Sequence, residues 1–502
     1  MSPTRATPLP SGWTSCSIGD ITLPVDKIDA RDAPDRQIHY IDISGIDNER
    51  NVIANTKHLR LGDAPSRARQ IVKAGDVLFA TVRPYLRNIA SVPTSLDNEI
   101  ASTGFSVLRP SEAVDPRLLY YHSISRQFVN ALSGAQYGVS YPAVNDDQVK
   151  SQEFKLPPIQ EQLRISAKIE ELFSELDYGI GSLETALQKL SAYRQSLLTS
   201  AFDGRLTAEW RACNPAAAES REVISSRIQE QRNSHYQSML EKGQKLRVPK
   251  TLAPLSLSAL AELPAVPACW IWGKLGWMTC GVEYGTAAKS AGAGSVPVLR
   301  MGNIQGGKLD WSDLVYTSDK AEIAKYRLTE GDVLFNRTNS PELVGKTAVY
   351  RGERPALFAG YLIRVNQIAT VVDSQYLNLF LNSPIARRHG NRVKTDGVNQ
   401  SNINGDKLMN FPFPYCPIEE QREIVRILDE RLTSIDRTEL ALNQEISRAE
   451  ALRQSVLNQA FCGRLVAQES EDEPAEILLR RSTLEKEGAD VAKKKNNRRK
   501  AA

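Results

Sequence analysis

A near match to a nucleotide-binding loop stands at Ser340-Pro341-Glu342-Leu343-Val344-Gly345-Lys346-Thr347. Loops of the type GxxxxGK[ST] hold phosphates on backbone N–H groups because they open directly into a helix. Here Ser340 replaces the first glycine, and the following Ala348-Val349-Tyr350 is typical of a strand. We therefore expect a turn here and no ATP site.

Other catalytic templates also fail. A DNA adenine methyltransferase would need an Asn/Asp-Pro-Pro-aromatic tetrapeptide, which Asn214-Pro215-Ala216 does not supply. The sequence contains no FxGxG methyl-donor loop, no GxSxG, and no compact Asp/Glu–Lys cluster that would bind a nuclease metal. The six cysteines show no CxxC spacing and the five histidines no HExxH, so no zinc site is predicted. We expect a chain with no catalytic centre and no cofactor.

Side chains suited to reading DNA occur in matching loops of the two halves of the chain. Arg can make paired hydrogen bonds to guanine and Asn or Gln to adenine, whereas Lys, Arg and hydroxyl groups suit phosphates. The first half offers Arg83, Tyr85, Arg87 and Asn88 after a strand expected at 75–81, and Ser140 and Tyr141 after Gly138. The second half offers Asn336, Arg337, Asn339 and Lys346 in one loop, and Asn399, Gln400, Ser401 and Asn402 in another.

We predict that these loops form a DNA interface, because they differ between the halves while their flanks agree. Arg67 and Arg69 suit phosphate contacts. For any single one of these residues the alternative is an ordinary solvated loop side chain.

An internal repeat supplies the elements that must position these loops. Pro158-Ile159-Gln160-Glu161-Gln162 recurs 259 residues later as Pro417-Ile418-Glu419-Glu420-Gln421. The same offset, without a gap, relates Arg194-Gln195-Ser196 to 453–455 and Gly204-Arg205-Leu206 to 463–465. Weaker matches lie upstream: 9–13 with 266–270, 75–79 with 331–335, and 138–139 with 397–398. The chain is thus two half-units, each with a variable part followed by a nearly invariant segment.

The nearly invariant segments are predicted to be long helices. Their apolar residues fall mostly three or four apart, at Ile165, Ile169, Leu172, Leu176, Ile180, Leu183, Leu187, Leu190, Leu197 and Ala201, and at Ile424, Leu428, Leu432, Ile435, Leu442, Ile446, Ala449, Val456 and Ala460. Such a narrow seam with charged flanks is typical of a coiled coil. Prolines 158 and 417 suit helix starts, and glycines 204 and 463 suit helix ends. The alternative is a surface helix on its own domain, but two matched copies favour pairing with each other.

The variable parts are predicted to be mixed α/β. Strands are expected at 38–43, 77–82, 106–108, 296–301, 333–336, 347–350 and 361–365, and helices at 118–132 and 374–390. The predicted fold class is α+β, with two globular, mixed α/β domains joined by two long helices that pair as a coiled coil. The predicted boundaries are 1–157 for the first domain, 158–211 for its helix, 212–265 for a polar helix (within 215–243) and a proline-rich tether that runs on to 267, 266–416 for the second domain, 417–466 for its helix, and 467–502 for a helical or disordered basic tail.

Composition fits this organisation. The chain has 502 residues, which suits two to four domains, with 41% hydrophobic and 24% charged residues. A net charge of +4 is too small for bulk polyanion binding, so a nucleic-acid site must be a local basic patch. The N-terminus lacks a signal-peptide pattern and no run of about 18 apolar residues occurs, so we expect a cytoplasmic protein that makes no membrane contact.

With these motifs in place, the chain resembles the specificity subunit of type I restriction-modification systems, over about residues 9–480. The resemblance is carried by both copies of the Pro-Ile-x-Glu-Gln motif, by Phe202-Asp203-Gly204-Arg205-Leu206 and Phe461–Leu465, and by the Leu-Pro-x-Gly-Trp openings. The second opening has Cys269 where the family usually has glycine, which affects only the local turn.

The resemblance implies that each variable part is a target-recognition domain, which reads one half of a bipartite site in double-stranded DNA. It also implies that the two coiled-coil helices are antiparallel, fix the distance between the halves and bind two methylation subunits, which carry the methyl-donor cofactor. Two motor-nuclease subunits would complete a restriction endonuclease and adenine methyltransferase. This chain would then supply recognition and no catalysis.

Two other functions are compatible with parts of the sequence. A stand-alone sequence-specific DNA-binding regulator would bind its site tightly in a gel shift without partners. A coiled-coil scaffold without a DNA role would show no salt-dependent DNA affinity, and it leaves the paired divergent domains unexplained.

Overall fold

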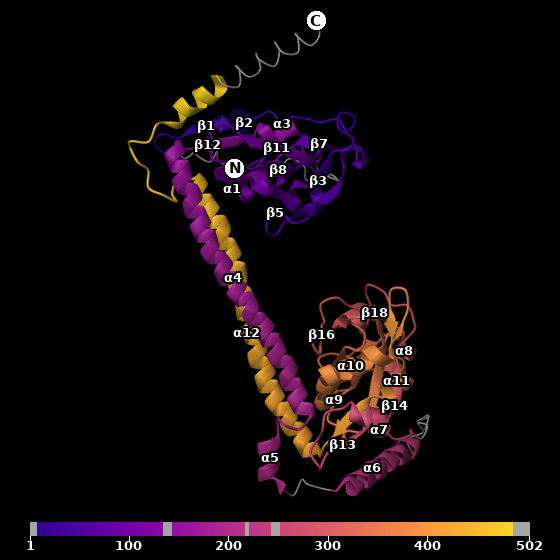
Figure 1. Ribbon diagram of the computed structural model, residues 1–502. Coiled ribbons are helices and arrows are strands. Elements are labelled where there is room, and N and C mark those ends of the chain that lie inside the picture. Colours follow the sequence, from indigo (N-terminus) through magenta and orange to yellow (C-terminus); the bar gives the residue numbers. More distant parts are fainter. Residues whose placement is uncertain (1–7, 134–142, 216–219, 242–251, 485–502) are drawn as a thin grey trace. The chain divides into compact units, whose positions relative to one another are not determined.

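A computed structural model describes residues 8–133, 143–215, 220–241 and 252–484 (Figure 1). The chain divides into two compact units: unit 1 comprises 1–184 and 443–502, and unit 2 comprises 185–442. Among the described helices, none combines the length and apolar character needed to cross a bilayer. The basic end of the tail, residues 493–500, lies outside the described residues.

Unit 1 contains a globular part built on two four-stranded sheets. One sheet has the order β6-β3-β10-β7, with β3 and β10 parallel, and the other has the order β2-β11-β8-β9. Two-stranded pairs β1–β12 and β4–β5 complete it. The bounds are β1 Thr14–Ser17, β2 Thr22–Leu23, β3 Gln37–Ile41, β4 Ile46–Asp47, β5 Val52–Ile53, β6 Lys57–Arg60, β7 Ala68–Ile71, β8 Val77–Ala80, β9 Ile89–Ser91, β10 Ile100–Ser102, β11 Phe105–Pro110, β12 Glu153–Leu156, α1 Pro116–Ser123, α2 Arg126–Ser133 and α3 Asp146–Lys150.

Unit 2 contains a globular part with the same plan. Its sheets have the orders β14-β23-β19-β21 and β18-β15-β22, the pairs are β13–β26 and β16–β17, and a further sheet β20-β25-β24 is formed. The bounds are α5 Ala208–Cys213, α6 Arg221–Glu241, α7 Leu257–Ala261, β13 Ile271–Lys274, β14 Thr279–Tyr284, β15 Val296–Leu299, β16 Ile304–Gln305, β17 Lys308–Leu309, β18 Val315–Thr317, α8 Lys320–Tyr326, β19 Val333–Asn336, β20 Thr338–Asn339, β21 Thr347–Val349, β22 Leu357–Phe358, β23 Leu362–Gln367, α9 Ser374–Leu381, α10 Pro384–Val393, β24 Thr395–Asp396, β25 Ser401–Asn402, α11 Gly405–Met409 and β26 Pro412–Tyr415.

The two nearly invariant segments are single helices that lie side by side (Figure 1). Helix α4 spans Ile159–Phe202 and α12 spans Ile418–Phe461, and each has 44 residues. Arg194 of α4 pairs with Asp436 of α12 at 2.6 Å in unit 2, and Arg453 of α12 pairs with Asp177 of α4 in unit 1. Arg194 and Arg453 occupy the same repeat position, and so do Asp177 and Asp436. Each ion pair is therefore the repeat of the other with the two helices exchanged, as an antiparallel pairing of two equivalent helices requires. The predicted fold class is confirmed.

The predicted helix ends are also confirmed. Each helix begins directly after its proline, whose carbonyl accepts the first intrahelical N–H, from Gln162 and Gln421 at 2.9 and 3.0 Å. The glycines that follow the last turn have φ of +80° at Gly204 and +67° at Gly463, a left-handed conformation that side chains with a Cβ disfavour.

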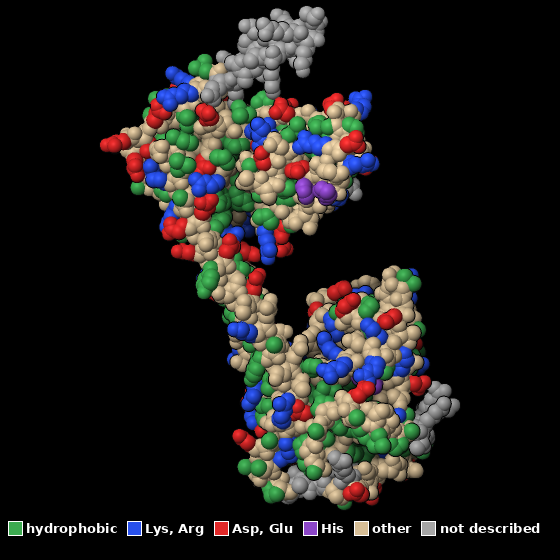
Figure 2. Space-filling model, in the orientation of Figure 1, with side chains coloured by type: hydrophobic (Ala, Val, Ile, Leu, Met, Phe, Trp, Pro, Cys, Tyr) green, Lys and Arg blue, Asp and Glu red, His purple; other side chains and the backbone are tan. Residues whose placement is uncertain are grey.

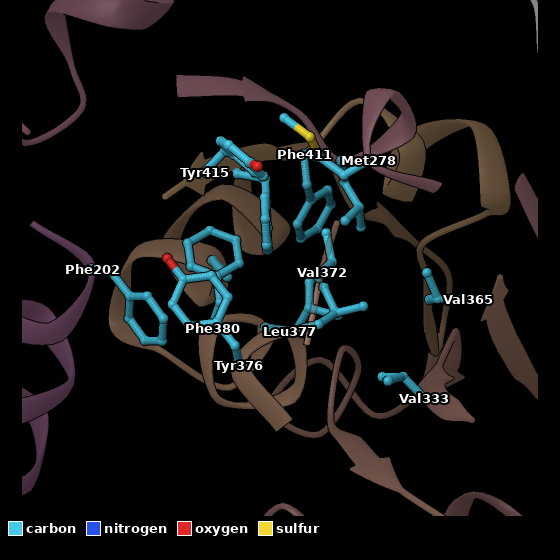
Figure 3. Close-up of a cluster of buried hydrophobic side chains, with 14 of the residues drawn as sticks. Phe202, Met278, Val333, Val365, Val372, Tyr376, Leu377, Phe380, Phe411 and Tyr415 are labelled. Atoms are coloured by element: carbon cyan, nitrogen blue, oxygen red, sulfur yellow. The ribbon is translucent and has the colours of Figure 1, made fainter. Parts of the chain in front are cut away.

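The core of unit 2 is continuous with its end of α4 (Figure 3). Phe202 of α4 meets the rings of Tyr376 and Phe380 edge-on, at centroid distances of 5.3 and 5.2 Å. Such edge-to-face pairs add about 0.5–1.5 kcal/mol each to the burial of the rings. The long helix is therefore part of the domain core in this unit.

Two sequence predictions differ from the structure in their continuity. Single helices were expected over 118–132 and 374–390, but each place holds two helices, α1 with α2 and α9 with α10. Ser125 and Ser383 accept the N–H groups of Phe128 and Ala386, both at 3.3 Å. Pro384 also occupies the first position of α10. A side-chain cap and a proline at this position start a new helix rather than continue the old one.

The segment expected to be a tether also differs. Residues 252–267 include α7 and contact the globular part of unit 2. The indole N–H groups of Trp277 and Trp272 donate to the carbonyl oxygens of Leu252 and Pro264, at 3.2 and 2.9 Å. Partly buried indole N–H groups need acceptors, and this segment supplies them.

In unit 1 a histidine occupies a position where unit 2 has an aromatic ring. His122 of α1 is 8% exposed and packs on Phe154 and Phe461 at centroid distances of 4.7 and 4.9 Å. In unit 2 the equivalent residue is Phe380, which packs on Phe413 and Phe202. Neither ring nitrogen has a hydrogen-bond partner among the described residues. Burial lowers the pKa of His122 to about 3.

We expect His122→Phe to remove a pH dependence of the stability of unit 1. The ordinary histidine pKa is about 6.5, so the unfolded chain binds a proton below this pH that the folded chain excludes until pH falls near 3. Stability linked to His122 is therefore complete above pH 6.5 and smaller by about 2 kcal/mol at pH 5. Urea unfolding at pH 5 and pH 8 measures this difference. His58→Phe, at an exposed site, is the control and should keep it; an unchanged difference in His122→Phe would contradict the assignment.

Candidate nucleic-acid interface

The repeated motifs form the junctions between the domains and the long helices. In unit 1 the indole N–H of Trp13 donates to Glu161 at 3.0 Å, and in unit 2 that of Trp270 donates to Glu420 at 2.8 Å. All four side chains are buried. The Leu-Pro-x-Gly-Trp opening and the Pro-Ile-x-Glu-Gln motif are thus two sides of one contact.

The glutamine of each motif continues this junction. The Gln162 amide donates to the carbonyls of Ala113 and Pro157, at 3.0 and 2.9 Å, and its oxygen accepts the N–H of Asp115 at 2.8 Å. Gln421 does the same with Val371, Cys416 and Asp373. Asp115 and Asp373 cap the N-termini of α1 and α9. The motifs that carry the repeat are therefore structural, and any base-reading residues must lie elsewhere.

The two junctions differ in the hydrogen-bond partners of their glutamates. Glu420 also accepts hydrogen bonds from Thr207, at 2.6 Å, and from the guanidinium of Arg211. Glu161 has no such partner: one of its oxygens makes no hydrogen bond to a described residue, and burial raises its pKa. Burial therefore favours the neutral form of the Glu161 carboxyl.

In unit 2 a small sheet brings both predicted loops together. Strand β20 lies within the first loop and β25 within the second; Thr338 pairs with Asn402 and Asn339 with Ser401. Strand β24 pairs with β25 on its other side. The Asn402 amide donates to the Thr338 hydroxyl at 2.7 Å, which fixes the register. Residues from two segments that are distant in the sequence, such as Thr338 and Asn402, are thereby held in one sheet.

Arg337, which directly precedes β20, is held by this arrangement. Its guanidinium lies over the Tyr284 ring, 4.8 Å from the centroid, and its backbone bonds to Tyr361 and Ile403 at 3.0 and 2.9 Å. A weak contact of 3.4 Å joins it to the Gly360 carbonyl, and its Nε has no hydrogen-bond partner among the described residues. Stacking on tyrosine restricts the side chain but leaves hydrogen-bond donors unused.

The predicted residues differ in exposure. Asn399 and Gln400 are exposed at the tip between β24 and β25, and Asn339, Lys346 and Asn402 are half-buried. Lys346 donates to Gln305 at 3.1 Å. Asn336 and Ser401 are fully buried, so neither reaches the surface in this conformation. The loop from Ser340 to Thr347 enters strand β21 and no helix, as the sequence predicted.

In unit 1 the corresponding loop is a short 3₁₀ turn at Pro84–Leu86. Tyr85 is exposed, and Arg83 and Asn88 are half-buried. Arg87 is directed inward: its guanidinium donates to the carbonyl of Ile124 at the end of α1, at 2.7 Å, and burial lowers its pKa. Ser140 and Tyr141 lie outside the described residues. Arg67 and Arg69 are exposed, and Arg69 pairs with Asp29 at 3.3 Å.

Sequence reasoning missed a cationic helix beside the small sheet. Helix α10 carries Arg387 and Arg388, both exposed, and Figure 2 shows Lys and Arg side chains gathered over this part of unit 2. Within the described residues, neither arginine forms an ion pair with a carboxylate. Arg387, Asn391 and Lys346 line one hollow of about 110 Å³. The run Arg387-Arg388-His389-Gly390-Asn391-Arg392 was the available signal in the sequence.

Comparisons with known proteins agree on one family. The family model described as "Type I restriction modification DNA specificity domain" matches residues 10–182 and 284–448. The specificity subunit of type I restriction enzyme EcoKI from Escherichia coli K12 is 26% identical over 373 residues, which cover 73% of this chain and 69% of that protein. The StySPI specificity subunit from Salmonella potsdam is 24% identical, over 78% and 76%.

A solved structure is also similar. A chain from work on complex assembly and conformational transition of the type I R-M system matches with a TM-score of 0.68 and 25% identity, covering 92% of this chain and 100% of that one.

Proposed function

Because this chain belongs to the type I restriction-modification DNA specificity family, we propose that its two globular parts each read one half of a bipartite site in double-stranded DNA. The observation that carries this proposal is the sheet β20-β25-β24, which brings the half-buried Asn339 and Asn402 and the exposed Asn399 and Gln400 of its tip close to Arg337. Amide and guanidinium groups are the side chains that discriminate adenine and guanine. In unit 1 the corresponding proposal rests on Arg83, Tyr85 and Asn88, with Arg87 positioning the turn.

The proposal divides the contacts of unit 2 into two kinds. The exposed amides and Arg337 read bases, while Lys346 and the arginines of α10 contact phosphates. Phosphate contacts set the register and add salt-dependent affinity without sequence information. A two-stranded hairpin such as β24–β25 fits the major groove, where all four base pairs are distinguishable.

In this proposal the paired helices α4 and α12 set the spacing of the two half-sites. A helix of 44 residues is about 66 Å long, roughly two turns of B-DNA. Ion pairs and an apolar seam along its length keep such a pair stiff.

The helices also dock two copies of a methylation subunit. Tyr193 and Leu452 occupy the same repeat position and are 48% and 49% exposed. Two equivalent apolar side chains on exposed helix faces suit two copies of one partner. Two motor-nuclease subunits complete the assembly, which acts in the cytoplasm. The methyl donor and all catalytic steps belong to those partners, and the domain boundaries 1–157 and 266–416 delimit the two readers.

We expect Arg337→Ala to weaken binding to the cognate site by about 1–3 kcal/mol and to relax one base position of the unit 2 half-site. Binding by the assembled complex to a panel of single-base variants of the site measures both effects. Arg354→Ala is a matched control, because Arg354 stacks on Trp311 at the same 4.8 Å but is not part of the small sheet. A uniform loss on every sequence would make Arg337 a phosphate contact instead.

A further inference from the structure

One apolar side chain stands at the tip of the hairpin that the proposed function places on DNA. Val398 lies between β24 and β25 and is 99% exposed, the highest value among the large hydrophobic side chains of the described residues. Its neighbours Asn399 and Gln400 are exposed polar residues. Because the tip carries a single β-branched side chain, Val398 presents two methyl groups on a stiff stem.

The hairpin under this side chain is held in place on several sides. The N–H of Gly397 donates to the Gln400 carbonyl at 2.7 Å, and the Ser401 hydroxyl bonds to Asp396. Lys394 donates to the Pro341 carbonyl at 3.1 Å, and Lys407 donates to the Thr395 hydroxyl. These contacts, together with the pairing of β25 with β20, hold the hairpin that carries Val398.

Both cations and a carboxylate lie near the tip. Lys394 and Lys407 flank the hairpin and Arg337 lies at the start of the neighbouring strand β20, while Asp396 of β24 pairs with Lys394 at 3.7 Å. The three cations favour a polyanion over an apolar protein surface. An exposed apolar group among them therefore suits an apolar partner that belongs to a nucleic acid.

We propose that Val398 reads the C5-methyl group of one thymine in the half-site that unit 2 recognises. In the major groove this methyl is the only apolar group that distinguishes one base pair from another, and small aliphatic side chains contact it. The inference rests on the proposed function and extends it. It assigns one A·T pair to this half-site, and Val398 distinguishes that pair by an apolar contact with the thymine methyl group, in addition to the hydrogen bonds made by neighbouring residues. The sequence repeats Gly-Val at 138–139, while the following residues differ between the halves.

Replacing thymine by uracil tests this assignment, because uracil lacks only the methyl group. Binding of the full chain in its complex is measured on the cognate duplex and on duplexes with uracil at each thymine of the half-site in turn. One position should weaken wild-type binding about fourfold, the effect of one buried methyl group. Val398→Ala should bind the thymine duplex about fourfold more weakly and should bind thymine and uracil equally at that position.

Leu257→Ala is the matched control, since Leu257 is another highly exposed apolar residue of unit 2, on α7; it should keep the preference for thymine. Because Val398 is exposed, its truncation leaves the domain core intact. The inference is overturned if no uracil substitution matters, if Val398→Ala keeps the preference, or if it weakens binding to all sequences equally. Complete absence of sequence-specific binding by the wild-type complex would instead refute the proposed function.

Discussion

Exchange of residues 271–415 for the same segment of another family member should change one half of the recognised DNA site completely and leave the other half unchanged. The segment begins with β13 and ends with β26, which pair antiparallel with Ile271 opposite Tyr415. Both cut points are therefore adjacent, and an exchanged domain of the same fold can close on the same two chain ends. Sequencing of the methylated positions in cells that carry the chimaera gives both half-sites directly.

These cut points keep the Trp270–Glu420 contact of the unit 2 junction. Trp270 and Glu420 lie outside the exchanged segment, so their buried hydrogen bond and the Arg211 contact survive. A corresponding exchange in unit 1, between β1 and β12, where Thr14 pairs with Leu156, should change the other half-site only. If either chimaera changed both halves, the two domains would not be independent readers.

Aspartate at Tyr193 or Leu452 should each remove one copy of the methylation subunit from the complex, and the double variant should remove both. A charge placed in an apolar interface without a partner costs about 3 kcal/mol or more, which is over a hundredfold in affinity. The two sites belong to different units of this chain, so each single variant should bind one copy with unchanged affinity. Native mass spectrometry of the chain mixed with its methylation subunit measures the stoichiometry.

Tyr178→Asp is the control for this experiment. Tyr178 is 82% exposed on α4, but its repeat equivalent is Arg437, so it does not belong to a duplicated apolar face. This variant should bind two copies. Loss of both copies from a single variant at Tyr193 or Leu452 would contradict two equivalent docking faces and would point to a partner that binds only as a dimer.

The sequence predicted the features that produce a periodic pattern or a repeated motif. The long helices, their starts after Pro158 and Pro417, and their ends at Gly204 and Gly463 followed from residues whose burial and backbone conformation are set locally. The family followed from the repeated motifs. The seam residues Ile165, Ile169, Ile424 and Leu428 are buried as their spacing indicated. In an amphipathic helix the buried residues recur every three or four positions. One copy of this pattern therefore indicates a helix, and a second matched copy strengthens the prediction.

The exposure of individual loop side chains was not predictable from local sequence patterns. Asn336 and Ser401 have the chemistry of base readers, but strand pairing places them inside, and Arg87 is drawn to the end of α1 by a carbonyl 37 residues away. The opposite holds for Arg387 and Arg388, which belong to a second short helix that the sequence did not separate from the first. The predicted DNA contacts among the remaining residues stay predictions.

The amino-acid sequence by itself determined the duplicated plan of this protein, because repeated motifs and helical periodicity act through near neighbours in the chain. Only the tertiary structure decided which polar side chains of the loops face outward and that Trp13, Glu161 and Gln162, with their second copies, form junctions rather than a binding site. The physical reason is that these outcomes depend on partners far away in the sequence: a buried indole or amide must find its acceptor wherever the fold supplies one.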